Sequence, residues 1–188
     1  MDPTAELRER DALIDRIRPY AEATGLYALT LASVAEELQM PLARLQDFFA
    51  DKEELIAALI ADYRITLRAK FATVDFRRPD AELYREMWET YRDMPAGNLY
   101  FEAFGYALHD DHYKDFLSGT NDWLSWVRGA LVARGVPSDR ADAVATLTIA
   151  VFRGALVDLL ASGDRARVNR AVALFVDLVT GVPGDAEA

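Results

Sequence analysis

The chain has 188 residues, of which 52% are hydrophobic and 28% charged, so it is long and apolar enough to bury a continuous core. It has no cysteine, which excludes a disulfide framework, a thiol nucleophile and cysteine-ligated metal sites. Its 31 acidic and 21 basic side chains give a net charge of −10, which disfavours bulk attraction to polyphosphate or anionic lipid. Charges interrupt every long apolar run and the N-terminal residues are highly charged, so we expect a cytoplasmic protein with no membrane segment and no signal peptide.

Helical periodicity dominates the first third of the chain. Apolar residues recur at helical spacing over about residues 5–24, and Gly25 is expected to end this first helix. Pro19 lies inside it and is expected to bend or restart the helix. Thr30 is expected to cap a second helix of about two turns, and Pro41 to occupy the first position of a third. The core-facing side chains of this third helix are expected to be Leu45, Phe48 and Phe49.

The rest of the chain is predicted to be helical as well. Asp51 and Glu54 form an Asp-x-x-Glu pattern, typical of a capping box, before a fourth helix over about residues 52–71. Residues 73–80 are the best linker candidate, and the tail over 181–188 is expected to be frayed. Further helices are expected over about residues 81–93, 99–109, 113–134, 139–161 and 165–180. The sequence therefore predicts an all-α protein of about nine helices.

Short helices closing on a long fourth one, with about four residues between the second and third, are typical of a helix-turn-helix unit. Over residues 25–55 the sequence resembles, without a gap, the DNA-binding domain of TetR-family transcriptional regulators. The matching positions are Gly25, Ala28, Thr30, Val34, Ala35, Glu36, Leu45, Phe48, Phe49, Lys52, Glu53 and Leu55. The resemblance implies a three-helix DNA-binding domain over residues 1–52, followed by a larger helical domain over residues 53–188 for effector binding and dimerisation.

The same resemblance implies a ligand-responsive repressor that binds a palindromic operator in double-stranded DNA as a homodimer. The reading helix would be the third, about Pro41–Phe49, lying in the major groove. The residues expected at the DNA are Thr30, Pro41, Leu42, Ala43, Arg44, Gln46, Asp47 and Lys52. Arg8 and Arg10 are expected to form a basic N-terminal arm. Family members dimerise through their last two long helices, which correspond here to residues 139–161 and 165–180.

Several positions depart from the family pattern and motivate a second hypothesis. Gln39 stands where the family commonly has glycine in the turn, and Pro41 where it has serine or threonine. Gln46 replaces a tyrosine that often touches phosphate, and Asp47 replaces an aromatic side chain. The first 55 residues contain six basic and twelve acidic side chains, a net charge of −6. The alternative is a helical dimer that binds a hydrophobic ligand or partner protein and has a DNA-binding-deficient helix-turn-helix.

Aromatic side chains are dense in the helices expected beyond residue 80. Ordinary packing between helices accounts for most of them, because aromatic rings supply large buried area in any core. An apolar pocket for a small hydrophobic effector is the second interpretation, and the resemblance favours it. The side chains expected to line such a pocket are Tyr91, Tyr100, Phe104, His109 and Trp126.

The segment from His109 to His112 has two histidines close together in sequence, as a metal site would need. The two histidines and a nearby carboxylate such as Asp115 could form a two-histidine, one-carboxylate site. The segment also lies at an expected helix junction, where aspartate commonly caps a helix and histidine is solvated, and we favour this interpretation. The sequence shows no glycine-rich phosphate loop and no nucleophile elbow, so we expect no enzyme activity, no catalytic residues, no cofactor and no metal.

Overall fold

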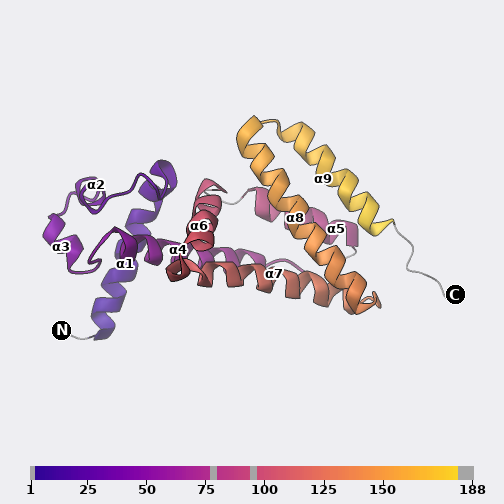
Figure 1. Cartoon of the computed structure of the whole chain (residues 1–188), viewed down its shortest axis with the longest axis horizontal. Coiled ribbons are helices and arrows are strands. Elements are labelled where there is room, and N and C mark those ends of the chain that lie inside the picture. Colours follow the sequence, from indigo (N-terminus) through magenta and orange to yellow (C-terminus); the bar gives the residue numbers. More distant parts are fainter. Residues whose placement is uncertain (1–2, 77–79, 94–96, 182–188) are drawn as a thin grey trace. The chain divides into compact units, whose positions relative to one another are not determined.

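The computed structural model describes residues 3–76, 80–93 and 97–181, and over these ranges it contains nine α-helices, a 3₁₀ turn and no strand (Figure 1). The helices are α1 (Pro3–Thr24), α2 (Leu31–Glu37), α3 (Leu42–Gln46), α4 (Lys52–Phe71), α5 (Asp80–Arg92), α6 (Gly97–His109), α7 (Asp115–Val132), α8 (Ser138–Ser162) and α9 (Arg165–Thr180). The 3₁₀ turn η1 (Asp111–Tyr113) precedes α7. The all-α prediction is confirmed. The expectation of a frayed tail falls mostly on residues 182–188, outside the described ranges.

The helices form two compact units. The first comprises Met1–Leu67 and Asn98–Leu117, and the second comprises Arg68–Gly97 and Ser118–Ala188. The first unit therefore contains α1 to α3, most of α4, and α6, whereas α5, α8 and α9 belong to the second. The predicted boundary after residue 52 stays a prediction.

The N-terminal helix differs from two expectations. α1 continues through Pro19 and ends at Thr24, so the expected restart of the helix at this proline is wrong. The helix begins at Pro3, so Arg8 and Arg10 lie within it and do not form an extended basic arm. A proline removes one backbone donor, so this helix lacks one of its internal hydrogen bonds at Pro19.

Hydrogen bonds at their ends explain where α2 and α3 begin. Thr30 caps α2 as predicted: its Oγ1 accepts from the Ser33 amide at 3.0 Å, and the Ser33 hydroxyl accepts from the Thr30 amide at 3.2 Å. α3 begins at Leu42 and not at Pro41, which has an extended backbone with ψ of 134°. The Pro41 carbonyl accepts from the Arg44 amide at 3.0 Å. Pro41 is thus the N-cap of a helix shorter than expected.

The start of α4 and the core beneath α3 follow the sequence pattern. Asp51 Oδ1 accepts from the Glu54 amide at 2.8 Å, and Glu54 Oε2 accepts from the Ala50 amide at 2.9 Å. This is the predicted capping pattern, with its second bond to the residue before Asp51. The expected core residues are confirmed as buried: Leu45, Phe48 and Phe49. Burial of this face leaves the opposite side of α3 to solvent.

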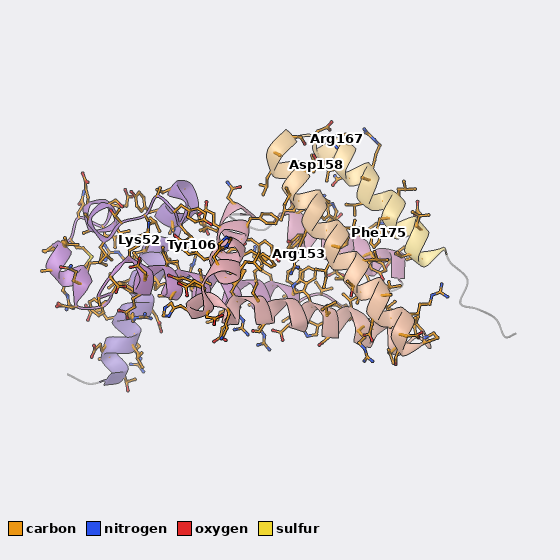
Figure 2. All side chains as sticks on the ribbon, in the orientation of Figure 1. Lys52, Tyr106, Arg153, Asp158, Arg167 and Phe175 are labelled. Atoms are coloured by element: carbon orange, nitrogen blue, oxygen red, sulfur yellow. The ribbon has the colours of Figure 1, made fainter. Side chains whose placement is uncertain are left out.

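The second unit is organised around the hairpin of α8 and α9. Gly163 ends α8 in the left-handed conformation, with φ of +68°, and Asp164 caps α9 by accepting from the Arg167 amide at 3.0 Å. Asp158 and Arg167, labelled in Figure 2, form a two-pronged ion pair with both N–O distances at 2.7 Å. These contacts fix the antiparallel turn.

Helix α5 packs against this hairpin. The Trp88 indole donates to Asn169 Oδ1 on α9 at 2.9 Å, and its ring lies 5.6 Å from that of Phe152 on α8. The Tyr84 ring lies 6.2 Å from Phe175, also on α9.

Helix α8 is also long and apolar enough, by length and composition, to cross a membrane. A single helix of this kind is weak evidence, because a helix that packs inside a soluble protein passes the same test. Arg153 and Asp158 lie within it.

Candidate nucleic-acid interface

The turn between α2 and α3 sets the direction of the third helix. Gln39 takes a left-handed backbone with φ of +51°, the conformation that favours glycine. The Met40 amide then donates to the Ala35 carbonyl at 3.0 Å, which closes the chain back on α2. The glycine expected from the family pattern thus has a conformational reason, and glutamine adopts the same geometry here.

All eight residues predicted to contact DNA lie in the first unit, at the start of α2, on α3 with its N-cap and C-cap, or at the start of α4. Leu45 is fully buried and anchors α3, so its neighbours in sequence face outward. The exposed members of the set are Thr30, Pro41, Leu42, Ala43, Gln46 and Asp47. Arg44 and Lys52 are partly exposed. This surface, from Thr30 through α3 to Lys52, is called the reading face below.

Arg44 is the only basic side chain of the reading face on α3, and acceptors from its own chain surround it. Its Nη2 donates to Glu9 on α1, and its Nη1 donates to Asp47 Oδ2 at 3.2 Å. The guanidinium carbon lies 4.6 Å from the centre of the Phe48 ring. The hydrogen bond to Glu9, followed by that to Asp47, raises the pKa of Arg44 above its ordinary value.

Lys52 also has a partner within the chain. Its Nζ donates to the Tyr27 carbonyl at 2.8 Å, across 25 positions of sequence. A backbone carbonyl does not neutralise the ammonium, so the positive charge stays available to a phosphate near this point. Lys52 is labelled in Figure 2.

Two other arginines of the first unit also have partners within the chain. Arg10 lies over the Phe49 ring, with its guanidinium carbon 5.0 Å from the ring centre, and its Nη2 is 3.7 Å from Glu54. Arg16 donates to the Leu38 carbonyl at 3.3 Å. These contacts tie α1 to the segments around it, and so part of the basic charge of the module has a structural role.

An open depression lies beside the reading face. Three of its side chains are carboxylates and one is an arginine. The residues that line it are Glu6, Leu7, Arg10, Gln46, Asp47, Phe48, Ala50 and Glu54. The acidic balance of the first 55 residues is therefore concentrated partly next to α3, where it opposes the approach of phosphate.

Solved structures resemble the whole chain. A TetR-family transcriptional regulator from Cytophaga hutchinsonii aligns with a TM-score of 0.77 at 19% identity, covering 97% of this chain and 98% of that one. The chain has the fold of TetR-family transcriptional regulators. A transcriptional regulator from Rhodococcus sp. Rha1 aligns with a TM-score of 0.76 at 15% identity, covering 92% of this chain and 96% of that one.

A third structure, described as the multidrug binding protein EbrR complexed with imidazole, aligns with a TM-score of 0.66 at 21% identity and covers 95% of this chain and 98% of that one. Neither a protein-family model nor a curated protein matches the sequence. At these identities the likeness is one of fold.

In this TetR-like fold, α6 packs on the turn between α1 and α2 of the same unit. Glu102 on α6 accepts from the Leu26 amide, 76 positions away in sequence. The Tyr106 ring stacks on Tyr27, with 4.9 Å between centroids and 20° between planes. Gly105 leaves room for Tyr27, whose hydroxyl oxygen would lie 2.7 Å from a Cβ at that position. Sequence reasoning missed this contact, because nothing local in either segment indicates the other.

The side chains predicted to line an effector pocket are distributed over both units. Tyr100, Phe104 and His109 lie on α6 in the first unit. Tyr100 is buried, 5.8 Å from the ring of Phe116, and His109 is exposed, with Nδ1 3.0 Å from the Gly105 carbonyl oxygen.

The other two predicted effector contacts belong to the second unit. Tyr91 on α5 is buried, with its ring 5.4 Å from that of Trp123. Trp126 on α7 is partly exposed, 6.0 Å from Phe76. The structure thus brings Tyr100 and Phe104 together, 6.0 Å apart, and places Tyr91 in an aromatic cluster of its own. The joint lining of a pocket stays a prediction.

The segment from His109 to His112 forms a helix junction. Asp110 accepts from the His112 amide at 2.8 Å and caps the 3₁₀ turn. This is the capping role that we favoured for the segment. Among the described residues, no group of three or more histidine, aspartate or glutamate side chains is placed to hold a metal ion.

Proposed function

We propose that this protein is a sequence-specific DNA-binding transcriptional regulator, a ligand-responsive repressor that acts as a homodimer. The observation that carries the proposal is the outward side of α3, which presents Leu42, Arg44 and Gln46 on a chain with the TetR-family fold. Helix-turn-helix proteins place such a helix in the major groove. In this proposal Arg44 reads a base edge or phosphate, and Lys52 holds the DNA backbone.

The charge of the module sets how DNA binding would depend on salt. Arg44 and Lys52 lie within a surface of net negative charge, but screening over about 8 Å at physiological salt lets local cations act separately from more distant carboxylates. If each subunit neutralises about two to four phosphates, the dimer has a log–log salt slope of about −4 to −7. Binding of this kind is moderate at physiological salt and much tighter at about 50 mM salt.

Dimerisation through α8 and α9 is supported by the apolar side chains that these helices expose. Five large apolar residues of the hairpin are between 44% and 61% exposed: Leu147, Val157, Leu160, Leu174 and Leu178. Large apolar side chains exposed close together are typical of a protein interface. A two-fold axis through it would pair two reading faces with the two halves of a palindromic operator.

A small hydrophobic effector is the proposed signal. The dense rings around Tyr91 and around Tyr100 supply apolar surface with a few polar atoms, the chemistry that such ligands need. The description of one structural neighbour as a multidrug binding protein agrees with this chemistry. The effector would act by binding one of two dimer states more tightly and shifting their equilibrium. A rise in melting temperature with an apolar compound, reduced in Tyr91→Ala, would support the assignment.

The structural neighbours are regulators and not enzymes, and we propose that this chain likewise has no enzyme activity. We propose that it is in the cytoplasm, because its operator would be there.

The second candidate function is a helical dimer that binds a hydrophobic ligand or partner protein and no DNA. It is favoured by one specific observation: Arg44 is already bound by Glu9 and Asp47.

Selection of bound fragments from the host genome tests the proposal without a guess at the operator. The regulator is expected to enrich fragments that share a palindrome, and fluorescence anisotropy is then expected to show saturable, sequence-dependent binding at about 50 mM salt. Absence of any enriched sequence and of saturable binding at that salt would contradict the proposal and favour the second function.

Substitution of each of the two cations of the reading face is expected to affect DNA binding differently. Arg44→Ala should lower the affinity for the operator on the order of tenfold and relax the sequence preference at one base pair, because a lost base contact affects one position. Lys52→Ala should lower the affinity for the operator and for random DNA by similar factors, and it should make the affinity depend less steeply on salt concentration. Equal losses on both DNAs in both variants would show that Arg44 contacts phosphate only.

A further inference from the structure

The Arg44 guanidinium is bound on three sides in the free protein. Glu9 accepts from Nη2, Asp47 accepts from Nη1 at 3.2 Å, and the Phe48 ring covers one face of the guanidinium at 4.6 Å. The side chains of Arg44 and Glu9 are 40% and 49% exposed, so the pair is at the surface and can open without disrupting the core.

The two carboxylates differ in how they are connected to Arg44. Asp47 is three residues from Arg44, directly after α3, so it stays beside the arginine however α3 moves. Glu9 belongs to α1 and reaches Arg44 from 35 positions away in sequence. Only Glu9 thus joins the reading helix to another helix through the arginine.

A two-pronged contact with DNA would use the terminal N–H groups of Arg44, and one of these now donates to Glu9. An arginine reads guanine O6 and N7, or grips a phosphate, with two parallel N–H groups of its planar fork. With Nη2 on Glu9 and Nη1 on Asp47, the fork has both terminal nitrogens engaged. A two-pronged contact that uses the Nη2 N–H now directed at Glu9 requires release of Glu9, whereas Asp47 can stay in place and hold the guanidinium from the side.

We propose, on the basis of the DNA-binding function argued above, that Glu9 is a positioning residue that competes with DNA for the Arg44 guanidinium and so lowers operator affinity. The resting protein spends part of its DNA-binding energy on opening this pair. Removing the Glu9 carboxylate leaves Arg44 oriented by Asp47 and Phe48 with Nη2 available for DNA.

The test is a set of anisotropy titrations on the operator recovered by genomic selection, at about 50 and 150 mM salt. Glu9→Gln is expected to tighten binding about two- to fivefold, which is the worth of an exposed ion pair expressed as a ratio of dissociation constants. Asp11→Asn is the matched control, because it removes one negative charge from an exposed position of the same helix. The control is expected to change affinity much less.

A cycle with Arg44→Ala separates competition from general electrostatics. If Glu9 acts through Arg44, then Glu9→Gln gains little or no affinity in the Arg44→Ala background. Equal gains in both backgrounds, or equal effects of Glu9→Gln and Asp11→Asn, would overturn the proposal. Circular dichroism and melting temperature of each variant confirm that the compared proteins are folded.

A measurement without DNA distinguishes failure of this inference from failure of the proposed function. In protein labelled with ¹⁵N-arginine, the Arg44 side-chain NMR signals are expected to shift in Glu9→Gln and stay in place in Asp11→Asn. Unmoved signals in Glu9→Gln would overturn the pairing itself. If the signals shift but neither wild type nor Glu9→Gln binds any selected DNA at about 50 mM salt, the proposed function is wrong and the claim that Glu9 sets DNA affinity is wrong with it.

Discussion

Gln39 is the described non-glycine residue with a positive φ, and it lies in the turn that orients α3. An L-residue with a Cβ pays on the order of 1–2 kcal/mol for the left-handed conformation, which glycine adopts without this strain. The turn persists because its backbone hydrogen bonds are made, with the Gln39 amide donating to the Glu36 carbonyl at 3.0 Å. The strain is therefore stored at a residue with an exposed side chain.

Gln39→Gly is expected to stabilise the protein by about 0.5–1 kcal/mol. Glycine relieves the backbone strain of the folded state, which stabilises the protein. Glycine also raises the conformational entropy of the unfolded chain, and this offsets part of the gain but not all of it. Urea unfolding followed by circular dichroism measures the change. Glu36→Gly, three residues earlier inside α2, is the matched control and should cost about 1 kcal/mol, since glycine there only weakens a helix. A loss of stability in Gln39→Gly would show that the glutamine side chain itself holds the turn.

Tyr63 on α4 gives the buried part of the first unit a dependence on pH. Burial raises the pKa of Tyr63 above its ordinary value of 10.0, and nearby Tyr100 and Glu22 add to the rise. The unfolded chain loses this phenolic proton near pH 10 while the folded chain keeps it. Stability linked to Tyr63 is therefore complete below about pH 10 and is lost as the pH rises further.

Tyr63→Phe should reduce the loss of stability that wild type shows between about pH 9 and 11. The measurement is the urea midpoint of both proteins at several pH values in that interval, each referred to its own value at neutral pH. This reference removes any difference that the hydroxyl makes at neutral pH. Parallel curves for the two proteins would show that Tyr63 ionises equally in the folded and unfolded states.

At the scale of helices, the sequence predicted what is locally encoded. The bounds of the helices agree with the predicted ones within three residues, because the repeat of apolar side chains and the capping residues lie within each segment. The largest difference is at α3, which ends at Gln46 instead of Phe49. Its expected first residue, Pro41, lies outside the helix with an extended ψ.

The contacts of the reading face were not predictable in the same way. The pair of Arg44 with Glu9, and that of Lys52 with the Tyr27 carbonyl, join segments 35 and 25 positions apart. Residue type and periodicity show which side chains carry charge, but pairing across this separation depends on how the helices pack. The positions of the predicted DNA contacts on one face were thus available from sequence, and the partners that restrain two of them were not.

The contact of α6 with the turn after α1 makes an element-scale prediction. Glu102→Ala should destabilise the first unit by about 1–2 kcal/mol, because the part-buried Leu26 amide loses a charged acceptor. Asn98→Ala, at an exposed position of the same helix, serves as the control. Hydrogen exchange at the Leu26 amide should become faster in Glu102→Ala and stay slow in the control. Unchanged exchange would show that this amide is protected by burial alone.

At the scale of the whole molecule, the exposed apolar side of the α8–α9 hairpin has to be accounted for. Leu174 and Leu178 are each 61% exposed on α9, one helical turn apart, so they lie on the same side of the helix. Leu147 and Val157 expose apolar surface on α8. A chain of net charge −10 resists nonspecific association, and a buried symmetric interface is the arrangement that removes this surface from water.

The double variant Leu174→Glu/Leu178→Glu should therefore convert the proposed dimer to a monomer of 21.0 kDa, measured by sedimentation equilibrium. Four carboxylates would meet across the two-fold axis without partners, which destabilises the dimer. The loss of buried apolar surface destabilises it further. Leu7→Glu, at an equally exposed leucine of α1, should leave the dimer intact. Operator affinity should fall by more than tenfold in the double variant, because a monomer engages one half-site and loses the gain from joining two. A monomeric wild type, or a double variant that stays dimeric, would place the dimer interface elsewhere or exclude it.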